Sequence, residues 1–232
     1  MRATSAPTPR PHPLRAWGIC HFMNTCFEAL CRATLSPVND SGPMKPAVAV
    51  LACLLVLPAT AGTVKGQVPV ANAEEAERTV IYIEQVPEGS YTPPPATPVK
   101  LSQKGARFWP AVLPVLKGTT VDLTNDDFVT HSIFSRSRVK PFDLGLYGKG
   151  QTKLMKFEQA GPVEIFCSIH PRMNGVILVL QNPFFTKPAA DGGFTLPNVP
   201  AGQWKLRVYR PGLAQEPVAV KVPARGTVQL AP

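Results

Sequence analysis

One short segment of the chain carries three side chains that bind metals. The segment lacks a further ligand, and this constrains the fold. Cys167, His170 and Met173 offer a thiolate, an imidazole and a thioether within seven residues. A copper site of the His₂Cys kind with a weak axial Met needs one more imidazole. His131 can supply it, but this residue lies well before the segment in the sequence. The fold must therefore bring two distant loops together.

Residues 44–61 have the pattern of a secretory signal peptide. Lys45 precedes the apolar run Ala47–Leu57, and Ala59–Ala61 suits a cleavage site. The apolar run has eleven residues, whereas a membrane-spanning helix needs about 20, so we expect no membrane span in the mature protein. A lipoprotein signal ending at Cys53 is the less favoured alternative, because it leaves a shorter apolar core.

Residues 1–43 precede this signal and are rich in Pro, Arg, Ser and Ala. The composition is that of a disordered or transit-like segment, and we interpret it as a leader that follows a start codon placed too early. Three cysteines of this leader fit no zinc-binding spacing, namely Cys20, Cys26 and Cys31. We therefore predict no function for them.

Without residues 1–61, the chain has a single cysteine, Cys167, and two histidines, His131 and His170. An unpaired thiol in an oxidising compartment reacts unless something holds it, and a metal ion does so. A simply buried cysteine is the alternative, but it leaves the spacing of His170 and Met173 unexplained. The same part of the chain has 19 Lys and Arg against 13 Asp and Glu, an excess too moderate to predict nucleic-acid binding.

Short β-branched and apolar runs separated by Gly and Pro recur from residue 62 onward, without long helical periodicity. This pattern predicts an all-β chain of the sandwich type. Glu74–Arg78 is expected to form a charged loop between the first two strands, and Pro93–Pro95 an extended linker after them. Gly175–Leu180 is almost entirely apolar, which predicts a strand buried on both faces.

Several motifs, in their order along the chain, resemble the cupredoxins, especially the amicyanin-like and plastocyanin-like domains of proteins labelled methylamine utilization protein. The matching elements are Phe108-x-Pro110, Gly118–Val121 leading to Asn125, Thr130–Ser132, Asp143-x-Gly145, Gly161, and Cys167-x-x-His170-x-x-Met173 followed by Gly175. The resemblance implies a Greek-key β-sandwich over residues 97–181. It also implies one copper ion held by four ligands, His131, Cys167, His170 and Met173, with the ring edge of His170 reaching solvent.

Two positions differ from the usual pattern of that family. Ser132 stands where Asn often follows the first His, and Ile169 stands where Pro often occurs. Ser132 can still hydrogen-bond to Ser168 and tie the two ligand loops together. Ile169 retains an N–H that Pro lacks, so we expect a second hydrogen bond to the Cys167 sulfur, which would raise the reduction potential.

The segment Gly193–Gly202 resembles the carboxypeptidase-regulatory-like or transthyretin-like sandwich. Members of that family often begin with a Gly-x-Val-x-Gly-x-Val stretch, which here is Gly62–Val68. We therefore expect a second, small sandwich whose first strands lie in residues 62–92 and whose last strands lie in residues 182–232. The cupredoxin-like segment would then be an insertion within it.

The resemblance implies a periplasmic type 1 copper protein that carries single electrons between partners such as a c-type cytochrome or a dehydrogenase. It would not be an enzyme, because both histidines are used by the metal and no base is left for a hydrolytic triad. Two alternatives stay open: a copper-binding or copper-delivery protein without electron transfer, and an adhesion or partner-binding module with structural copper. Zinc also suits the ligand types, but a structural zinc site needs a fourth strong donor, and Met is a poor one.

Four residues are candidates for docking a redox partner, namely Pro171, Arg172, Arg136 and Arg138. Basic residues at such an edge would attract an acidic partner, although a solvated loop is the favoured interpretation of Arg136 and Arg138. Asp126 and Asp127 are interpreted as turn residues that flank a ligand loop. Met155 falls in an alternating strand and is expected in the core.

Overall fold

The computed structural model describes residues 61–87 and 97–230. The predicted leader, the predicted signal peptide up to residue 60 (with Cys53) and the predicted linker Pro93–Pro95 lie outside the described residues, and Ala61 is the first residue of β1. Within the described ranges, no helix has the length and apolar character needed to cross a membrane.

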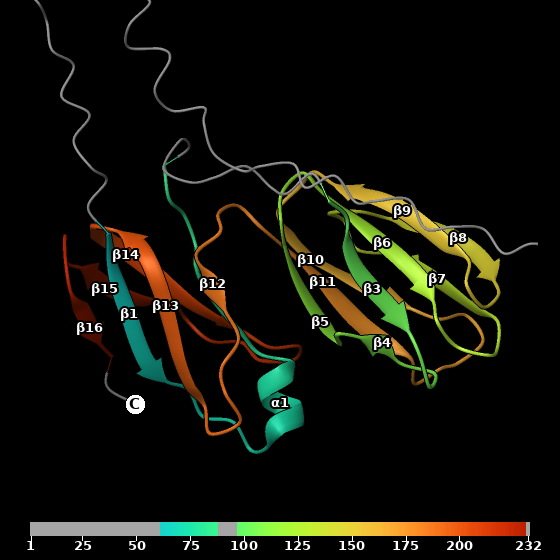
Figure 1. Ribbon diagram of the computed structural model, residues 1–232, viewed down its shortest axis with the longest axis horizontal. Coiled ribbons are helices and arrows are strands. Elements are labelled where there is room, and N and C mark those ends of the chain that lie inside the picture. Colours follow the sequence, from blue (N-terminus) through green and yellow to red (C-terminus); the bar gives the residue numbers. More distant parts are fainter. Residues whose placement is uncertain (1–60, 88–96, 231–232) are drawn as a thin grey trace, which may run out of the picture. The chain divides into compact units, whose positions relative to one another are not determined.

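The larger of two β-sandwiches is built from nine strands of the segment 99–180. One sheet has the order β4-β3-β6-β9 and the other has the order β5-β11-β10-β7-β8 (Figure 1). The strands are β3 (Val99–Gln103), β4 (Phe108–Trp109), β5 (Val112–Leu116), β6 (Thr119–Asn125), β7 (His131–Ser135), β8 (Phe142–Tyr147), β9 (Thr152–Phe157), β10 (Gly161–Phe166) and β11 (Asn174–Leu180). Side chains from both sheets form one buried core, which includes Leu101, Leu123, Ile133 and Ile165.

The smaller sandwich combines strands from both ends of the described chain. Its sheets have the orders β13-β1-β16 and β12-β2-β14-β15 (Figure 1). The strands are β1 (Ala61–Gln67), β2 (Val80–Ile83), β12 (Phe185–Thr186), β13 (Gly193–Pro200), β14 (Gly202–Tyr209), β15 (Val218–Val222) and β16 (Thr227–Gln229). β1 and β2 are each an inner strand of their sheet, and Val64, Ile81 and Ile83 are fully or almost fully buried in the core of this sandwich. The predicted all-β class with two sandwiches is confirmed.

β11 has apolar side chains on both faces, as its sequence predicts. Ile177 and Val179 lie in the core of the larger sandwich. The alternate residues Val176 and Leu178 point to the other face, as the two-residue period of a strand requires, and they pack in a separate buried cluster with Val80 of β2. Both faces of β11 are therefore buried, and neither needs polar side chains.

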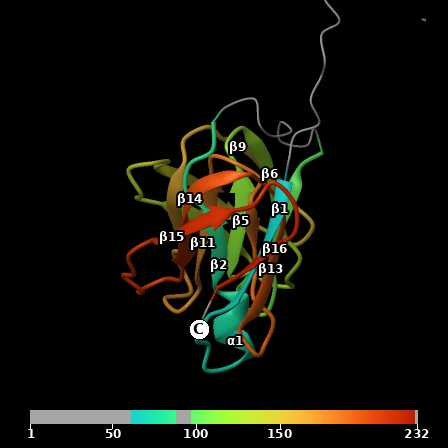
Figure 2. The same ribbon diagram turned by 90° about the vertical axis from the view of Figure 1, so that its left-hand side faces the viewer.

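The segment expected to be a charged loop is a short helix, α1 (Ala73–Glu77), and this prediction was wrong. The Asn72 side chain accepts a hydrogen bond from the backbone N–H of Glu75 at the helix start, which is a typical N-cap. Glu74 and Glu75 in the first turn also suit the helix dipole. Five residues are too few to show helical periodicity in the sequence. Figure 2 shows α1 beyond the ends of β1 and β13.

Candidate metal centre

The loop between β10 and β11 carries three of the four predicted ligands. The two strands form an antiparallel hairpin in which Phe166 faces Asn174, so residues 167–173 form its loop. Two backbone hydrogen bonds close this loop, from the Cys167 N–H to the Met173 carbonyl (3.2 Å) and from the Met173 N–H to the His170 carbonyl (2.9 Å). The loop is thus held in shape by its own backbone.

His131 reaches this loop because its strand pairs with β10. Phe134 of β7 lies opposite Phe166 of β10, which places the start of β7 beside the residue that follows β10. His131 is completely buried there, and Cys167 is 5% exposed. Sheet pairing therefore brings together two residues that are 36 positions apart in the chain.

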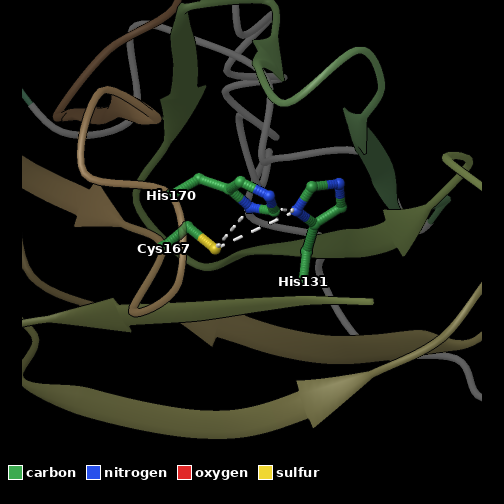
Figure 3. A group of neighbouring side chains, drawn as sticks. All are labelled: His131, Cys167 and His170. Carbon is green, nitrogen blue, oxygen red and sulfur yellow. Dashed lines mark hydrogen bonds between the residues drawn. The ribbon is translucent and has the colours of Figure 1, made fainter. Parts of the chain in front are cut away.

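Two imidazoles and one thiol converge on a common point (Figure 3). The Nδ1 atoms of His131 and His170 are 3.0 Å apart. The Cys167 sulfur lies 3.9 Å from Nδ1 of His131 and 3.6 Å from Nδ1 of His170. Met173 is buried and belongs to the same apolar core as Cys167. The donor types, two imidazole nitrogens, one sulfur and a nearby thioether, are those that a type 1 copper site uses.

Asp127 fixes the orientation of His131. Its Oδ2 lies 3.0 Å from Nε2 of His131, so the ring N–H donates there and the lone pair of Nδ1 faces the candidate site. The backbone N–H of Ala106 and the ring of His131 hold the pKa of the Asp127 carboxyl at about 2. Asp127 is therefore a carboxylate at neutral pH. The other oxygen of Asp127 accepts the Phe128 backbone N–H, which suits the turn residue expected from the sequence. The contact of Asp127 with His131 was not predicted.

Ser132 ties the two ligand loops together, as the sequence predicts. Its hydroxyl lies 2.8 Å from the hydroxyl of Ser168 and accepts the Ser168 backbone N–H at 2.8 Å. The same hydroxyl is 3.8 Å from the Cys167 sulfur. Ser132 thus links the start of β7 to the ligand loop, next to the thiol of Cys167.

The surroundings of Cys167 favour its thiolate. Burial raises the pKa of the thiol, but the backbone N–H groups of Ser132 and Ile169 and the imidazoles of His170 and His131 together lower it to about 6. The Ile169 N–H is thus among the groups that lower this pKa, and a hydrogen bond from it to the sulfur stays a prediction. Hydrogen bonds to a charged form stabilise that form, so the metal-free site holds a thiolate at neutral pH.

The predicted docking residues fall into two groups. Pro171 and Arg172 are exposed beside His170. Arg136 and Arg138 lie in the loop that follows β7. The Arg136 guanidinium lies 5.9 Å from the centre of the Phe134 ring, and the loop that contains Arg138 passes Gly161, at the opposite end of β10 from Cys167. Met155 packs against the larger core, as predicted.

The fold and the side chains thus define an all-β protein with a Cys–His–His cluster in which His131 and Cys167 are buried and His170 is half-buried. One family model, described as ER membrane protein complex subunit 7, beta-sandwich domain, matches residues 170–231. That range begins in the ligand loop and runs through β16, the last strand of the smaller sandwich. None of the curated proteins compared with this chain is a match.

Solved structures of copper proteins are similar to part of the chain. A novel purple cupredoxin from Nitrosopumilus maritimus is 28% identical over 35% of this chain and 98% of its own, with a TM-score of 0.33. A mutant amicyanin in its Cu(I) form is 22% identical over 35% of this chain and 81% of its own, with a TM-score of 0.34. A copper-containing nitrite reductase from Thermus scotoductus is 28% identical over 49% of this chain but only 27% of its own, with a TM-score of 0.36.

Proposed function

We propose that this chain is an exported type 1 copper protein that carries single electrons and is not an enzyme. The observation that supports this most is the convergence of the Cys167 sulfur with Nδ1 of His131 and Nδ1 of His170. These atoms come from two loops that sheet pairing and the Ser132 bridge hold in place. Contacts within the protein therefore hold the two ligand loops together.

Each proposed ligand has a distinct part. His131, Cys167 and His170 would hold the ion, and the Met173 thioether would be the weak fourth ligand. Copper bound there would supply a one-electron couple between Cu(II) and Cu(I). Burial of His131, Cys167 and Met173 excludes water from the site. His170 is half-buried, so a redox partner can approach the site most closely at its ring.

The side chains around the ligand loops suit a protein partner. Phe128, Val129 and Ile169 are exposed apolar residues within a few positions of a ligand, and Leu146 is exposed opposite Ser132. Apolar side chains at the centre of a contact with polar ones around it are typical of protein interfaces. We propose that a c-type cytochrome or a dehydrogenase docks here in the periplasm. A dehydrogenase would suit the methylamine utilization type that the motifs resemble.

Visible spectroscopy tests the proposal. After loading with one equivalent of Cu(II), the protein should show an intense thiolate-to-copper band that bleaches on reduction and returns on oxidation. Cys167→Ser should abolish the band. Met155→Leu is the matched control, because Met155 lies in β9 opposite Val121 of β6 and not on a ligand loop, and it should leave the band unchanged. Loss of the metal to a chelator on reduction would instead favour copper delivery.

A further inference from the structure

A cavity of about 670 Å³ lies beside the candidate metal centre. One wall is the ligand loop from His170 to Asn174, and another is the segment Gly105–Trp109. Helix α1 and Arg78, which follows it, contribute the third wall. A volume between about 300 and 1,000 Å³ is typical of sites for small molecules, so the cavity can hold an organic ligand.

Three arginines from three separate segments line this cavity: Arg78, Arg107 and Arg172. Among the described residues, the side chains of Arg107 and Arg172 have no hydrogen-bond or ion-pair partner, and Arg78 has only a 3.5 Å contact with Asn174. Their positive charges are therefore available to a ligand. A guanidinium offers a planar pair of N–H donors that matches carboxylate and phosphate oxygens.

Two carboxylates of α1 also line the cavity, but only one of them opposes this charge. Glu77 is paired with Lys187 at 2.9 Å, which neutralises it. Glu74 has no partner among the described residues and is exposed. Three guanidinium groups against one free carboxylate leave the cavity with an excess of positive charge.

The wall formed by α1 is held in place without the three arginines. The Arg210 guanidinium donates to the Pro69 carbonyl at 2.7 Å and to the Thr79 hydroxyl at 2.9 Å, and it also forms an ion pair with Glu75. These contacts fix both ends of the helix to the smaller sandwich. The cavity arginines are therefore not needed to hold the helix.

Apolar groups complete the lining. Phe108 and Met173 are buried and lie on the cavity wall, and the Trp109 ring is 49% exposed there. A ligand with a carbon skeleton would find apolar contacts as well as cationic ones. An inorganic anion would use only the arginines.

We propose that this cavity binds a small organic anion that carries two or more carboxylate or phosphate groups, in contact with the wall formed by His170. Arg107 and Arg172 bind the acidic groups, and Trp109 packs against the carbon skeleton. The bound anion occupies space next to the only proposed ligand that is half-exposed. The smaller sandwich thereby contributes to a site beside the metal centre through α1.

Calorimetry with citrate as the probe tests the proposal on the metal-free full chain. Citrate should bind with a stoichiometry of one. Arg107→Gln or Arg172→Gln should each weaken binding about tenfold, because each removes a charge-assisted hydrogen bond of about 1.4 kcal/mol. Arg136→Gln and Arg138→Gln are matched controls, since they remove the same charge from exposed sites outside the cavity, and they should leave the affinity unchanged. Circular dichroism verifies that each variant is folded.

Two results would overturn the proposal. One is the absence of saturable binding of both citrate and inositol hexakisphosphate, a polyphosphate probe. The other is equal weakening by Arg136→Gln and Arg172→Gln, which would mean that the probe responds only to net charge. Neither result bears on copper, because the measurement uses metal-free protein. A failed copper-binding experiment would likewise leave the calorimetric result standing.

Discussion

His131 uses both of its ring nitrogens, and only one of them faces the candidate metal centre. The other donates to Asp127, whose carboxylate is in turn held by the backbone N–H groups of Ala106 and Phe128. The tautomer of the ring is thus set by a carboxylate four residues upstream. Partners of this kind fix the orientation of a ligand and raise its basicity, and so affect metal affinity.

Asp127→Asn should therefore weaken copper binding. An amide accepts the His131 N–H less strongly than a carboxylate and can present its NH₂ group instead, so we expect copper affinity to fall roughly 10- to 100-fold. Competition with a chelator of known affinity measures the change. Asp126→Asn is the matched control, because Asp126 contacts Lys100 and Ser102 rather than the cluster. Equal losses in both variants would contradict the role of Asp127.

The thiol of Cys167 should titrate far below its ordinary pKa in the metal-free protein. The ultraviolet absorbance of the thiolate should appear with a midpoint near pH 6, against 9.0 for an unperturbed thiol. The folded pKa is the lower one, so the stability that the thiolate contributes is fully present above pH 9 and is lost as pH falls through about 6. Resistance to urea should therefore rise between these values. It should not do so in Cys167→Ser, and a midpoint above pH 8 would refute the prediction.

The N–H of Ile169 should tune the bound metal. It lowers the pKa of the Cys167 thiol, and hydrogen bonds to a ligand sulfur raise the reduction potential by reducing its donation to the metal. Ile169→Pro removes this N–H and should lower the potential. Ile169→Ala keeps it and is the control for the lost side chain. Potentiometry that gives Ile169→Pro an unchanged or higher potential would contradict the assignment.

For single residues, the sequence predicted which side chains form the cluster, but it did not predict all of their contacts. Residue types and spacing were enough to select the cluster formed by His131, Cys167 and His170, since they are the only His and Cys residues after residue 61. The contact of Asp127 with His131 depends on how the intervening loop turns back. The sequence offered one signal for this contact, namely that Asp127 lies four residues before the candidate ligand His131.

The elements that carry the site are strands whose ends lie close together. β10 ends just before Cys167, and β11 begins just after Met173. The strands were predictable because their apolar residues recur with the period of a sheet. Helix α1 was not, because its stability comes from the Asn72 cap and from Arg210, which is distant in sequence.

Gly175 lies near the start of β11, and adding a single methyl group there should lower the stability of the protein. A Cβ at this position would lie 3.0 Å from the Ala111 carbonyl oxygen and 3.2 Å from Cβ of Phe108. Phe108 belongs to β4, and the Ala111 carbonyl accepts the Val176 N–H of β11, so neither can easily move and Gly175→Ala should cost about 1–3 kcal/mol of unfolding free energy. Gly148→Ala is the control, because no atom lies within 4 Å of a Cβ there. Urea denaturation that ranks the two variants equally would contradict this.

At the scale of the whole molecule, strands from the beginning of the described chain pair with strands from its end. β1 pairs with β13 and with β16, and β2 pairs with β12 and with β14. The segment 99–180 lies between these partners in sequence and has its own buried core. Motif resemblance suggested this arrangement, but no local pattern in the sequence specifies which strands pair across such a distance.

A chain that begins at residue 97 should keep the larger sandwich and lose the smaller one. It lacks β1 and β2, each an inner strand, and with them the buried Val64, Ile81 and Ile83. Each of these side chains contributes roughly 1.5–3 kcal/mol by burial, and together they approach the total stability of about 5–15 kcal/mol of a typical domain. Nuclear magnetic resonance should therefore show dispersed signals for residues 99–180 and collapsed signals for residues 193–229. Adding residues 61–87 as a separate peptide provides the control, since it should restore the lost signals. Fully dispersed signals from the truncated chain alone would show that the smaller sandwich does not need its first two strands.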